Sequence, residues 1–389
     1  MKVLHIINTL SAGGAELHLL TLCRYLKRAR IEVVVACLKE HVKESRSLRR
    51  DFEQEGITVV NLGADRRFDP RCLVRLVRLL RQECPDLLHT HLPRADFAGA
   101  FSHFIYSSVP WICSIHGLYS RHWSGKRALP LFSLLWRHAD AIIAISHAVK
   151  TWVVNEWSVP SEKVTVIHYG IETERFAQSH VDLRHAWGLN GRAVVGAVGS
   201  LRPVKGHDLL IKGLPRVSEQ IPHASLLIAG HDLWGYGKTL QALIDKFHLN
   251  EQVRIVGFQS DVSSFLHALD VFALPSRSEG FGQVAIEAMA AGKPVVASKI
   301  APLTEIVIDG QTGILAEPDD PEAFADAITW LLMHPEEAQR MGRRGQERVQ
   351  DHFLAESMVI ETMSLYETVL SQRIRREGTD GKRKAICRH

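Results

Sequence analysis

The stretch Asp270-Val-Phe-Ala-Leu-Pro275-Ser-Arg-Ser-Glu279-Gly-Phe-Gly282-Gln-Val-Ala-Ile-Glu287 contains the pattern that decides the fold. Its first part is a short apolar run typical of a buried strand, and after Gly282 apolar residues recur at helical spacing. The stretch therefore predicts a strand, a glycine-containing turn and the start of a helix. In an open parallel sheet, ligands gather where strands end and helices begin, because the first N–H groups of a helix are unpaired.

Two carboxylates flank this turn, and they constrain the ligand. Glu279 precedes the helix, and Glu287 follows about two turns into it. Helix N–H groups attract an anion, whereas carboxylates accept hydrogen bonds from hydroxyl groups. A molecule with both a diphosphate and several hydroxyl groups, such as a nucleotide sugar, satisfies both requirements. An acidic helix start that serves only as a cap would explain Glu279 but not Glu287.

The same strand and helix pattern repeats along most of the chain. At 389 residues the chain is long enough for two domains. Short apolar runs that alternate with amphipathic segments predict parallel sheets, hence an α/β protein with two doubly wound domains. Expected strands in the first half are 3–7, 31–37, 57–62, 86–89, 111–115, 140–145 and 164–167. Those in the second half are 192–199, 224–229, 253–256, 270–274, 294–298 and 312–315.

The expected domains are 1–170, 171–352 and a C-terminal segment, 353–389. Helix-start signals at Asp320-Pro321 and His334-Pro335 predict helices near the end of the second domain. The C-terminal segment is expected to contain a helix that crosses back to the N-terminal domain, followed by a charged tail.

Composition restricts the class of protein. The chain is 46% hydrophobic and 23% charged, which is typical of globular proteins. Six scattered cysteines without a Cys-x-x-Cys pair favour a reducing compartment. We see no signal peptide and no apolar stretch of the roughly 18 residues that span a bilayer. We therefore expect a cytoplasmic protein, with peripheral association on the inner face of the membrane as an option.

The first half of the chain is basic and the second half acidic. A basic domain favours an acidic partner such as a phosphate or an anionic membrane, although a solvated basic face is as common. Arg71, Arg75 and Arg78 lie on one stripe of an expected helix, which either covers the sheet or lies on a membrane.

Further candidate residues follow other strands. Gly13 and Gly14 stand at an expected strand-to-helix turn, where backbone N–H groups can reach a phosphate. Arg202 and Lys205, just past the strand that ends near Gly199, are placed as a clamp for a diphosphate. Two solvated loop cations are the alternative.

Histidines and aspartates give no pattern for a metal site. His116 follows an expected strand, but one histidine among 21 is weak evidence. We interpret His89 and His91 as pointing to opposite faces of an extended segment, and therefore as unable to share a metal ion. The chain has no Asp-x-Asp triplet. We expect metal-independent chemistry without a cofactor.

In order along the chain, these segments resemble the family 4 glycosyltransferases, retaining enzymes in which two Rossmann-like domains face each other across a cleft (the GT-B architecture). The resemblance covers nearly the whole chain and is most specific from Glu279 to Glu287. The matching segments are Gly13-Gly14-Ala15-Glu16, Ser114-Ile115-His116-Gly117, Ile145-Ser146, Val166 to Glu172 with Phe176, Val198 to Arg202 with Lys205-Gly206, Val256-Gly257-Phe258 and Glu279 to Glu287.

The resemblance implies roles for two sets of residues. The set expected to act on the reacting groups comprises His116, which would bind the sugar near the reacting centre, Glu279, which would bind the transferred sugar, and Arg202 and Lys205, which would neutralise the diphosphate. The remaining donor-binding set comprises Gly14 at the phosphates, backbone N–H groups of Gly282, Gln283 and Val284, Glu287 at the ribose, and the backbone around Phe258 and Gln259 at the base.

The expected reaction is transfer of a sugar from a nucleotide-diphosphate donor, a UDP-sugar before a GDP-sugar, to a saccharide or lipid-linked acceptor. Cell-surface polysaccharide or glycolipid synthesis would use such an enzyme. Trp123, Lys126 and Arg127 suit a lipid-linked diphosphate or a growing saccharide as the acceptor. Glu172, Gln283 and the loop 231–237 depart from the family pattern, which leaves the donor sugar open.

Two other functions remain as alternatives. An epimerase or phosphorylase on the same scaffold would use the same nucleotide site. A non-catalytic protein that binds an anionic ligand or nucleic acid would need aromatic residues for base stacking, and these are few at 7%. We therefore expect no nucleic-acid partner.

Overall fold

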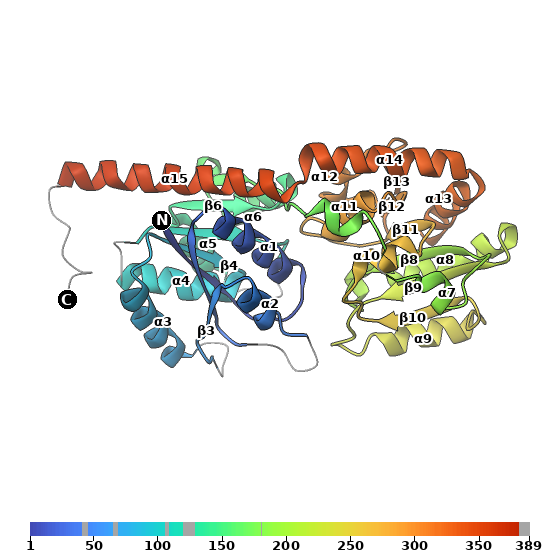
Figure 1. Cartoon of the computed structure of the whole chain (residues 1–389), viewed down its shortest axis with the longest axis horizontal. Coiled ribbons are helices and arrows are strands. Elements are labelled where there is room, and N and C mark those ends of the chain that lie inside the picture. Colours follow the sequence, from blue (N-terminus) through green and yellow to red (C-terminus); the bar gives the residue numbers. More distant parts are fainter. Residues whose placement is uncertain (41–45, 65–68, 106–108, 120–128, 180, 381–389) are drawn as a thin grey trace. The chain divides into compact units, whose positions relative to one another are not determined.

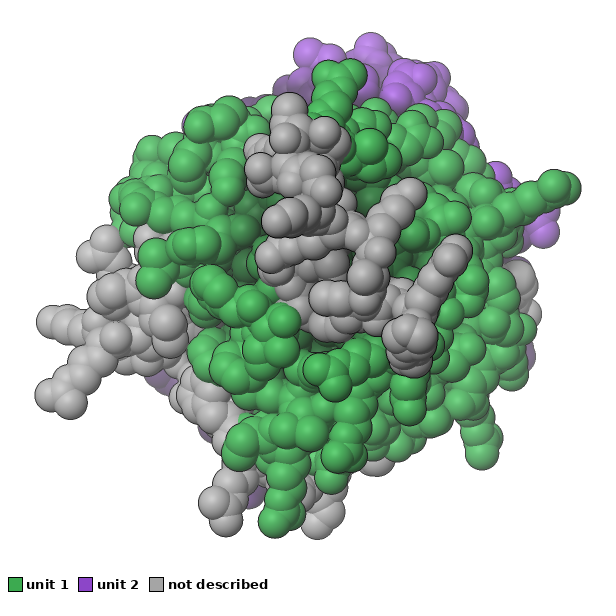
Figure 2. All heavy atoms as spheres, turned by 90° about the vertical axis from the view of Figure 1, so that its left-hand side faces the viewer, with its two compact units in different colours: residues 1–170, 355–389 green, residues 171–354 purple. Residues whose placement is uncertain are grey.

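A computed structural model describes residues 1–40, 46–64, 69–105, 109–119, 129–179 and 181–380. The chain forms two compact units (Figures 1 and 2). Unit 1 comprises residues 1–170 and 355–389, and unit 2 comprises residues 171–354.

In the described part of unit 1, seven parallel strands form a sheet in the order β3-β2-β1-β4-β5-β6-β7. The strands are β1 (Lys2–Ile7), β2 (Glu32–Cys37), β3 (Thr58–Asn61), β4 (Leu87–His91), β5 (Trp111–Ile115), β6 (Ala141–Ala144) and β7 (Val164–Val166). The helices are α1 (Gly14–Arg28), α2 (Arg49–Gln54), α3 (Pro70–Glu83), α4 (Pro93–Ile105), α5 (Leu129–His138), α6 (His147–Trp157) and α15 (Ala355–Asp380), with a 3₁₀ turn η1 (Ser161–Lys163).

The core of unit 1 explains why the C-terminal helix belongs to it. One apolar cluster joins β1 and β2 to α1, and it includes Phe52 of α2 and Met358 and Tyr366 of α15. Tyr366 is fully buried. Burial of an aromatic ring removes 150–250 Å² from water, roughly, so this helix is held to unit 1 by hydrophobic packing.

Unit 2 repeats the plan with six parallel strands in the order β10-β9-β8-β11-β12-β13. The strands are β8 (Ala193–Val198), β9 (Ala224–Ala229), β10 (Val253–Gly257), β11 (Val271–Leu274), β12 (Val295–Ser298) and β13 (Gly313–Ala316). The helices are α7 (Leu183–Ala186), α8 (His207–Gln220), α9 (Gly237–Lys246), α10 (Val262–His267), α11 (Gln283–Ala290), α12 (Leu303–Ile306), α13 (Pro321–Met333) and α14 (Pro335–His352), with 3₁₀ turns η2 (Thr173–Phe176) and η3 (Pro203–Lys205).

The strand order of both sheets confirms the predicted doubly wound α/β fold. In each sheet the first strand of the unit lies in the interior, with later strands added on both sides, as in Rossmann-like domains. Helices α13 and α14 begin at Pro321 and Pro335, as the start signals predicted, and Asp320 caps α13 by accepting from the backbone N–H of Glu322.

One interpretation of the sequence is wrong. His89 and His91 do not point to opposite faces of β4, because residues two apart in a strand share a face. Their ring centroids lie 4.2 Å apart, and both side chains are fully buried. His5 of β1 pairs with His89 in the parallel register and lies beside them. Among the described residues, no helix combines the length and the apolar character that a membrane span requires.

Candidate functional site

The turn between β11 and α11 forms as the sequence predicts, and glycine is required there. Gly282 caps α11 with φ of 106°, a backbone conformation that side chains disfavour. A Cβ atom at this position would lie 2.5 Å from the side chain of Leu303. The N-terminal N–H groups of α11 therefore begin directly after a residue without a side chain.

Lys205 and Glu279, which the sequence assigned to different ends of a ligand, are in direct contact. The Lys205 ammonium donates to the Glu279 carboxylate at 2.6 Å, and the Ser276 hydroxyl donates to the same oxygen at 2.7 Å. The side chain of Glu279 is 9% exposed and that of Lys205 is 23% exposed. An ammonium can donate three hydrogen bonds, so Lys205 keeps capacity for phosphate oxygens.

Glu287 is the buried carboxyl of the site. Its side chain faces Gln283, whose amide nitrogen donates to it at 2.9 Å. Burial raises the pKa of Glu287 to about 7, because a charge is disfavoured away from water. Near neutral pH the protonated form, which can donate a hydrogen bond, and the carboxylate, which only accepts, are therefore both populated.

Arg202, expected at the diphosphate, follows β8, and Phe258 and Gln259, expected at the base, follow β10. The Arg202 guanidinium lies 4.7 Å from the ring centroid of Trp234, within cation–π range. Phe258 stacks on His231 at 4.1 Å between centroids. The Gln259 side chain donates to the backbone carbonyl of Val256 at 2.9 Å.

Sequence reasoning did not identify Trp234 or His231 as partners in this region. The loop 231–237 departs from the family pattern, and that departure was the available signal. Trp234 is 60% exposed and Phe258 is 38% exposed, so aromatic rings line the surface at this edge of the sheet. Exposed rings of this kind can bind the flat face of another ring.

In unit 1, α1 begins at Gly14, after the loop that follows β1, as expected for a strand-to-helix turn. Glu16 in the first turn of this helix is buried and accepts from the hydroxyl of Thr9 at 3.3 Å. Burial raises the pKa of Glu16 to about 7. The backbone N–H groups here stand at the carboxyl end of β1, where a parallel sheet binds ligands.

His116, the expected contact to the sugar, has protein partners at both ring nitrogens. Its Nε2 lies 3.0 Å from Nδ1 of His91, and its Nδ1 lies 2.5 Å from the hydroxyl of Tyr169. His91 in turn places its Nε2 3.0 Å from Nδ1 of His5. These four residues form a continuous line of hydrogen bonds, which we call the histidine chain.

The histidine chain is uncharged. Burial lowers the pKa of His91 and His116 well below the ordinary value, and it lowers that of His5 to about 3. A neutral imidazole has one donor and one acceptor nitrogen, so the residues can pair in sequence along the line. The sequence contained a signal for this arrangement, since His5, His89 and His91 fall on adjacent strands.

His5, His89 and His91 have ring nitrogens close enough to hold a metal ion together. The hydrogen bonds favour a different interpretation. His89 bonds to Tyr366 at 2.6 Å and to Ser114 at 2.7 Å through its two nitrogens. Metal binding would break bonds that already satisfy buried groups, which is costly. The donor set therefore suits a hydrogen-bonded core better than a metal centre.

Trp123, Lys126 and Arg127, which the sequence suggested for the acceptor, lie outside the described residues. Val284, the remaining residue of the donor-binding set, is partly exposed in the first turn of α11. The roles of all these residues stay predictions.

Models of two known protein families match successive parts of the chain. Residues 182–348 match the model of glycosyl transferases group 1, and residues 12–175 match that of glycosyltransferase family 4. A glycogen synthase of Mycobacterium tuberculosis is 31% identical over 295 residues, which cover 72% of this chain and 68% of the relative. A capsular polysaccharide biosynthesis glycosyltransferase, CapM of Staphylococcus aureus, is 27% identical over 317 residues, covering 78% and 82%.

Among solved structures, Anabaena Alr3699/HepE in complex with UDP-glucose superposes with a TM-score of 0.85 at 25% identity, covering 95% of this chain and 100% of that one. Sequence, sheet topology and the turn at Gly282 lead to one assignment. The chain belongs to glycosyltransferase family 4, of the group 1 type, with two Rossmann-like domains.

Proposed function

We propose that this glycosyltransferase is a retaining enzyme that takes its sugar from a nucleotide-diphosphate donor, a UDP-sugar before a GDP-sugar. The observation that carries the proposal is the 2.6 Å contact between Lys205 and Glu279 beside the N-terminus of α11. A cation, a carboxylate and unpaired helix N–H groups then lie within reach of one ligand that has phosphates and hydroxyl groups.

Relatives support the choice of donor. The Anabaena protein binds UDP-glucose according to its structure. A GDP-mannose-dependent mannosyltransferase of Mycolicibacterium smegmatis acts on a phosphatidylinositol monomannoside and is 31% identical over 258 residues. CapM belongs to capsular polysaccharide synthesis. We infer a saccharide or lipid-linked acceptor, and a role in cell-surface polysaccharide or glycolipid synthesis.

In the proposed reaction, the bond between the sugar C1 and the β-phosphate oxygen breaks, and a bond from the acceptor oxygen to C1 forms on the same face. The acceptor proton passes to an oxygen of the departing diphosphate. Lys205 and Arg202 stabilise the negative charge that develops on this group, which is the step where preorganised cations accelerate a reaction most. Glu279 and Glu287 hold hydroxyl groups of the sugar and the ribose.

We further propose that the reaction needs no metal ion. The support is the pair of cations, Arg202 and Lys205, at the end of β8, which provide the positive charge that a divalent ion would otherwise supply. Transfer measured with and without EDTA tests this point. A loss of activity that added Mg²⁺ or Mn²⁺ restores would contradict it.

The direct test of function has two steps. UDP, GDP and ADP, each with its sugars, are first screened by thermal shift, where a ligand at 100 times its Kd adds roughly 2.7 kcal/mol. The stabilising donor is then incubated with saccharide and lipid-linked acceptors, and the anomeric configuration of the product is read by NMR. A product of inverted configuration, or an epimerised donor without transfer, would refute the proposal.

We also propose that unit 1 binds anionic membrane surfaces as a peripheral protein of the cytoplasmic face. Arg71, Arg78 and Arg81 of α3 are exposed. Phe104 and Ile105, at the end of the neighbouring helix α4, are 61% and 52% exposed. Exposed cations on one helix and exposed apolar side chains on a helix that contacts it suit an anionic bilayer surface. Co-sedimentation with phosphatidylglycerol vesicles, but not with phosphatidylcholine vesicles, is the expected result.

A further inference from the structure

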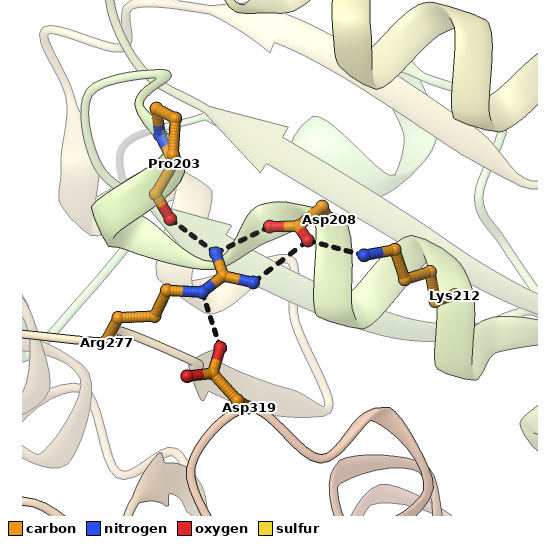
Figure 3. Close-up of polar contacts among 5 residues, drawn as sticks. All are labelled: Pro203, Asp208, Lys212, Arg277 and Asp319. Atoms are coloured by element: carbon orange, nitrogen blue, oxygen red, sulfur yellow. Dashed lines mark hydrogen bonds and ion pairs between the residues drawn. The ribbon is translucent and has the colours of Figure 1, made fainter.

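Arg277 lies in the loop between β11 and α11, two residues before Glu279, and its guanidinium makes four hydrogen bonds (Figure 3). Its Nη1 donates to the Pro203 carbonyl at 2.5 Å and to Asp208 at 2.8 Å. Its Nη2 donates to the other oxygen of Asp208 at 3.0 Å, and its Nε donates to Asp319 at 2.5 Å. One side chain therefore links three separate segments of unit 2.

The charge of Arg277 is already compensated. Asp208 and Asp319 carry two negative charges against those of Arg277 and Lys212, whose ammonium donates to Asp208 at 2.8 Å. Burial alone would raise the pKa of Asp208, but the hydrogen bonds from Arg277 and Lys212 outweigh it and lower the pKa to about 2. Arg277 is thus engaged within the protein and is not placed to bind a phosphate itself.

The segments that Arg277 links are those of the proposed donor site. Pro203 begins the turn η3, which ends at Lys205. The backbone N–H of Arg277 donates to the Val204 carbonyl at 2.8 Å, which adds a second bond between the two loops. Gly206 has φ of 67°, and a Cβ atom there would collide with the Pro275 carbonyl. The two loops are therefore packed backbone to backbone.

Lys205 and Glu279 lie at the ends of these joined loops and contact each other. A displacement of η3 would change the distance from the Lys205 ammonium to any phosphate bound at α11. A bidentate guanidinium fixes both distance and angle, which a lysine in its place does not. The geometry of Arg277 therefore suits it to fix the position of one loop relative to the other.

We propose that Arg277 is a positioning residue, which clamps the Pro203–Lys205 turn to the Glu279 loop and so sets the place of Lys205 at the donor diphosphate. This inference rests on the proposed function of that site. Because a misplacement of about 1 Å can cost 10²-fold in rate, we expect Arg277→Lys to lower kcat by on the order of 10²-fold, although it keeps the charge. The KM for the donor should change much less.

Two variants separate position from charge. Arg277→Gln removes one positive charge, and the double variant Arg277→Gln with Asp319→Asn restores the balance without the clamp. If Arg277 acts by position, both variants lose kcat to a similar extent. Recovery of kcat in the double variant would show an electrostatic effect and overturn the proposal.

Arg216 offers a matched control. It bonds to Asp326 in unit 2 at 2.5 and 3.1 Å through the same kind of bidentate contact, but between two exposed side chains of α8 and α13. Arg216→Lys should leave kcat unchanged. Equal losses in Arg216→Lys and Arg277→Lys would indicate a general effect on folding and would refute the clamp.

Two further measurements keep the inference testable if Arg277 variants fold poorly. Asp319→Asn replaces the exposed carboxylate that accepts from the guanidinium Nε by a neutral amide and so weakens one anchor. We expect a several-fold loss of kcat with a normal melting temperature, and an unchanged kcat would count against the clamp. In a Lys205→Ala background, Arg277→Lys should cost little more, because its effect passes through Lys205. Additive losses would contradict this. Transfer and UDP binding by the wild-type protein test the proposed function separately.

Discussion

Unit 1 and unit 2 each contain a doubly wound sheet, but the polar groups beside the two sheets differ in charge. Unit 1 buries neutral imidazoles in the histidine chain, whereas unit 2 sets ion pairs such as Lys205 with Glu279 at the ends of its strands. Neutral groups orient a partner without a strong field, while charges stabilise other charges. We therefore expect unit 2 to supply electrostatic stabilisation and unit 1 to supply fixed geometry.

Removal of the charge in unit 2 should have the largest effect. We expect Lys205→Ala to lower kcat by about 10²-fold or more, because the ammonium stabilises charge on the departing diphosphate. Steady-state kinetics with saturating donor measures it. Lys299→Ala is the control, since Lys299 forms a surface ion pair with Glu317 at 3.3 Å. Intact turnover in Lys205→Ala would remove this residue from the mechanism.

Burial of uncharged histidines in unit 1 should make this unit sensitive to acid. His18 stacks on Tyr169 at 4.1 Å, and burial lowers its pKa from 6.5 to about 3. The unfolded chain therefore binds a proton below pH 6.5 that the folded chain does not, so stability falls as pH decreases from 6.5 towards 3. The cost at pH 5 is on the order of 2 kcal/mol.

We expect His18→Phe to remove this cost, so that the variant gains stability over the wild type at pH 5 relative to pH 7.5. Urea unfolding followed by tryptophan fluorescence at the two pH values measures the difference. His223→Ala, a change of an exposed histidine in unit 2, is the control for the loss of a histidine outside the core of unit 1. A pH-independent change in His18→Phe would mean that burial does not suppress protonation of His18.

The geometry that unit 1 supplies can be tested at His91. Asparagine places a polar atom near the Nδ1 position, which faces His116, and glutamine places one near the Nε2 position, which faces His5. If the bond to His116 matters, kcat should fall about tenfold in His91→Gln and stay close to the wild-type value in His91→Asn; tenfold corresponds to about 1.4 kcal/mol. Equal losses in both variants would indicate that His91 only fills the core.

The sequence predicted the fold well because strand and helix signals are local. Strand 224–229 and the strands near 3–7 and 111–115 match the structure within a residue at each end. Apolar runs, proline starts and the glycine at 282 each act through neighbours in the chain. The domain-level pattern follows from their alternation.

Contacts between distant residues were not predictable in the same way. Nothing in Ser276-Arg277-Ser278 indicates that Arg277 bonds to Asp208 and Asp319, since these residues are far apart in the sequence. The histidine chain could have been anticipated, because a strand places residues two apart on one face. The interpretation that His89 and His91 point to opposite faces of the strand excluded this arrangement from the prediction.

The smallest effect is expected at Glu287 of unit 2. Like the histidines of unit 1, this side chain is buried, and within the described residues it forms no ion pair with a lysine or arginine. In this respect Glu287 is the site residue of unit 2 that most resembles the buried polar groups of unit 1. Burial raises its pKa to about 7. Above pH 7 the carboxylate accepts hydrogen bonds from the ribose, and below pH 7 the protonated carboxyl accepts them less well. Donor KM should therefore fall as pH increases from 6 to 8.

Glu287→Gln should raise donor KM at pH 8 about fivefold, which corresponds to about 1 kcal/mol for one charge-assisted hydrogen bond. Its KM should also lose the dependence on pH, because an amide does not titrate between pH 6 and 8. Measurements of KM for the donor across this range, with kcat as the internal reference, decide the matter. A wild-type KM that stays flat while kcat changes would place the titrating carboxyl elsewhere, with Glu16 of unit 1 as the next candidate because burial also raises its pKa to about 7.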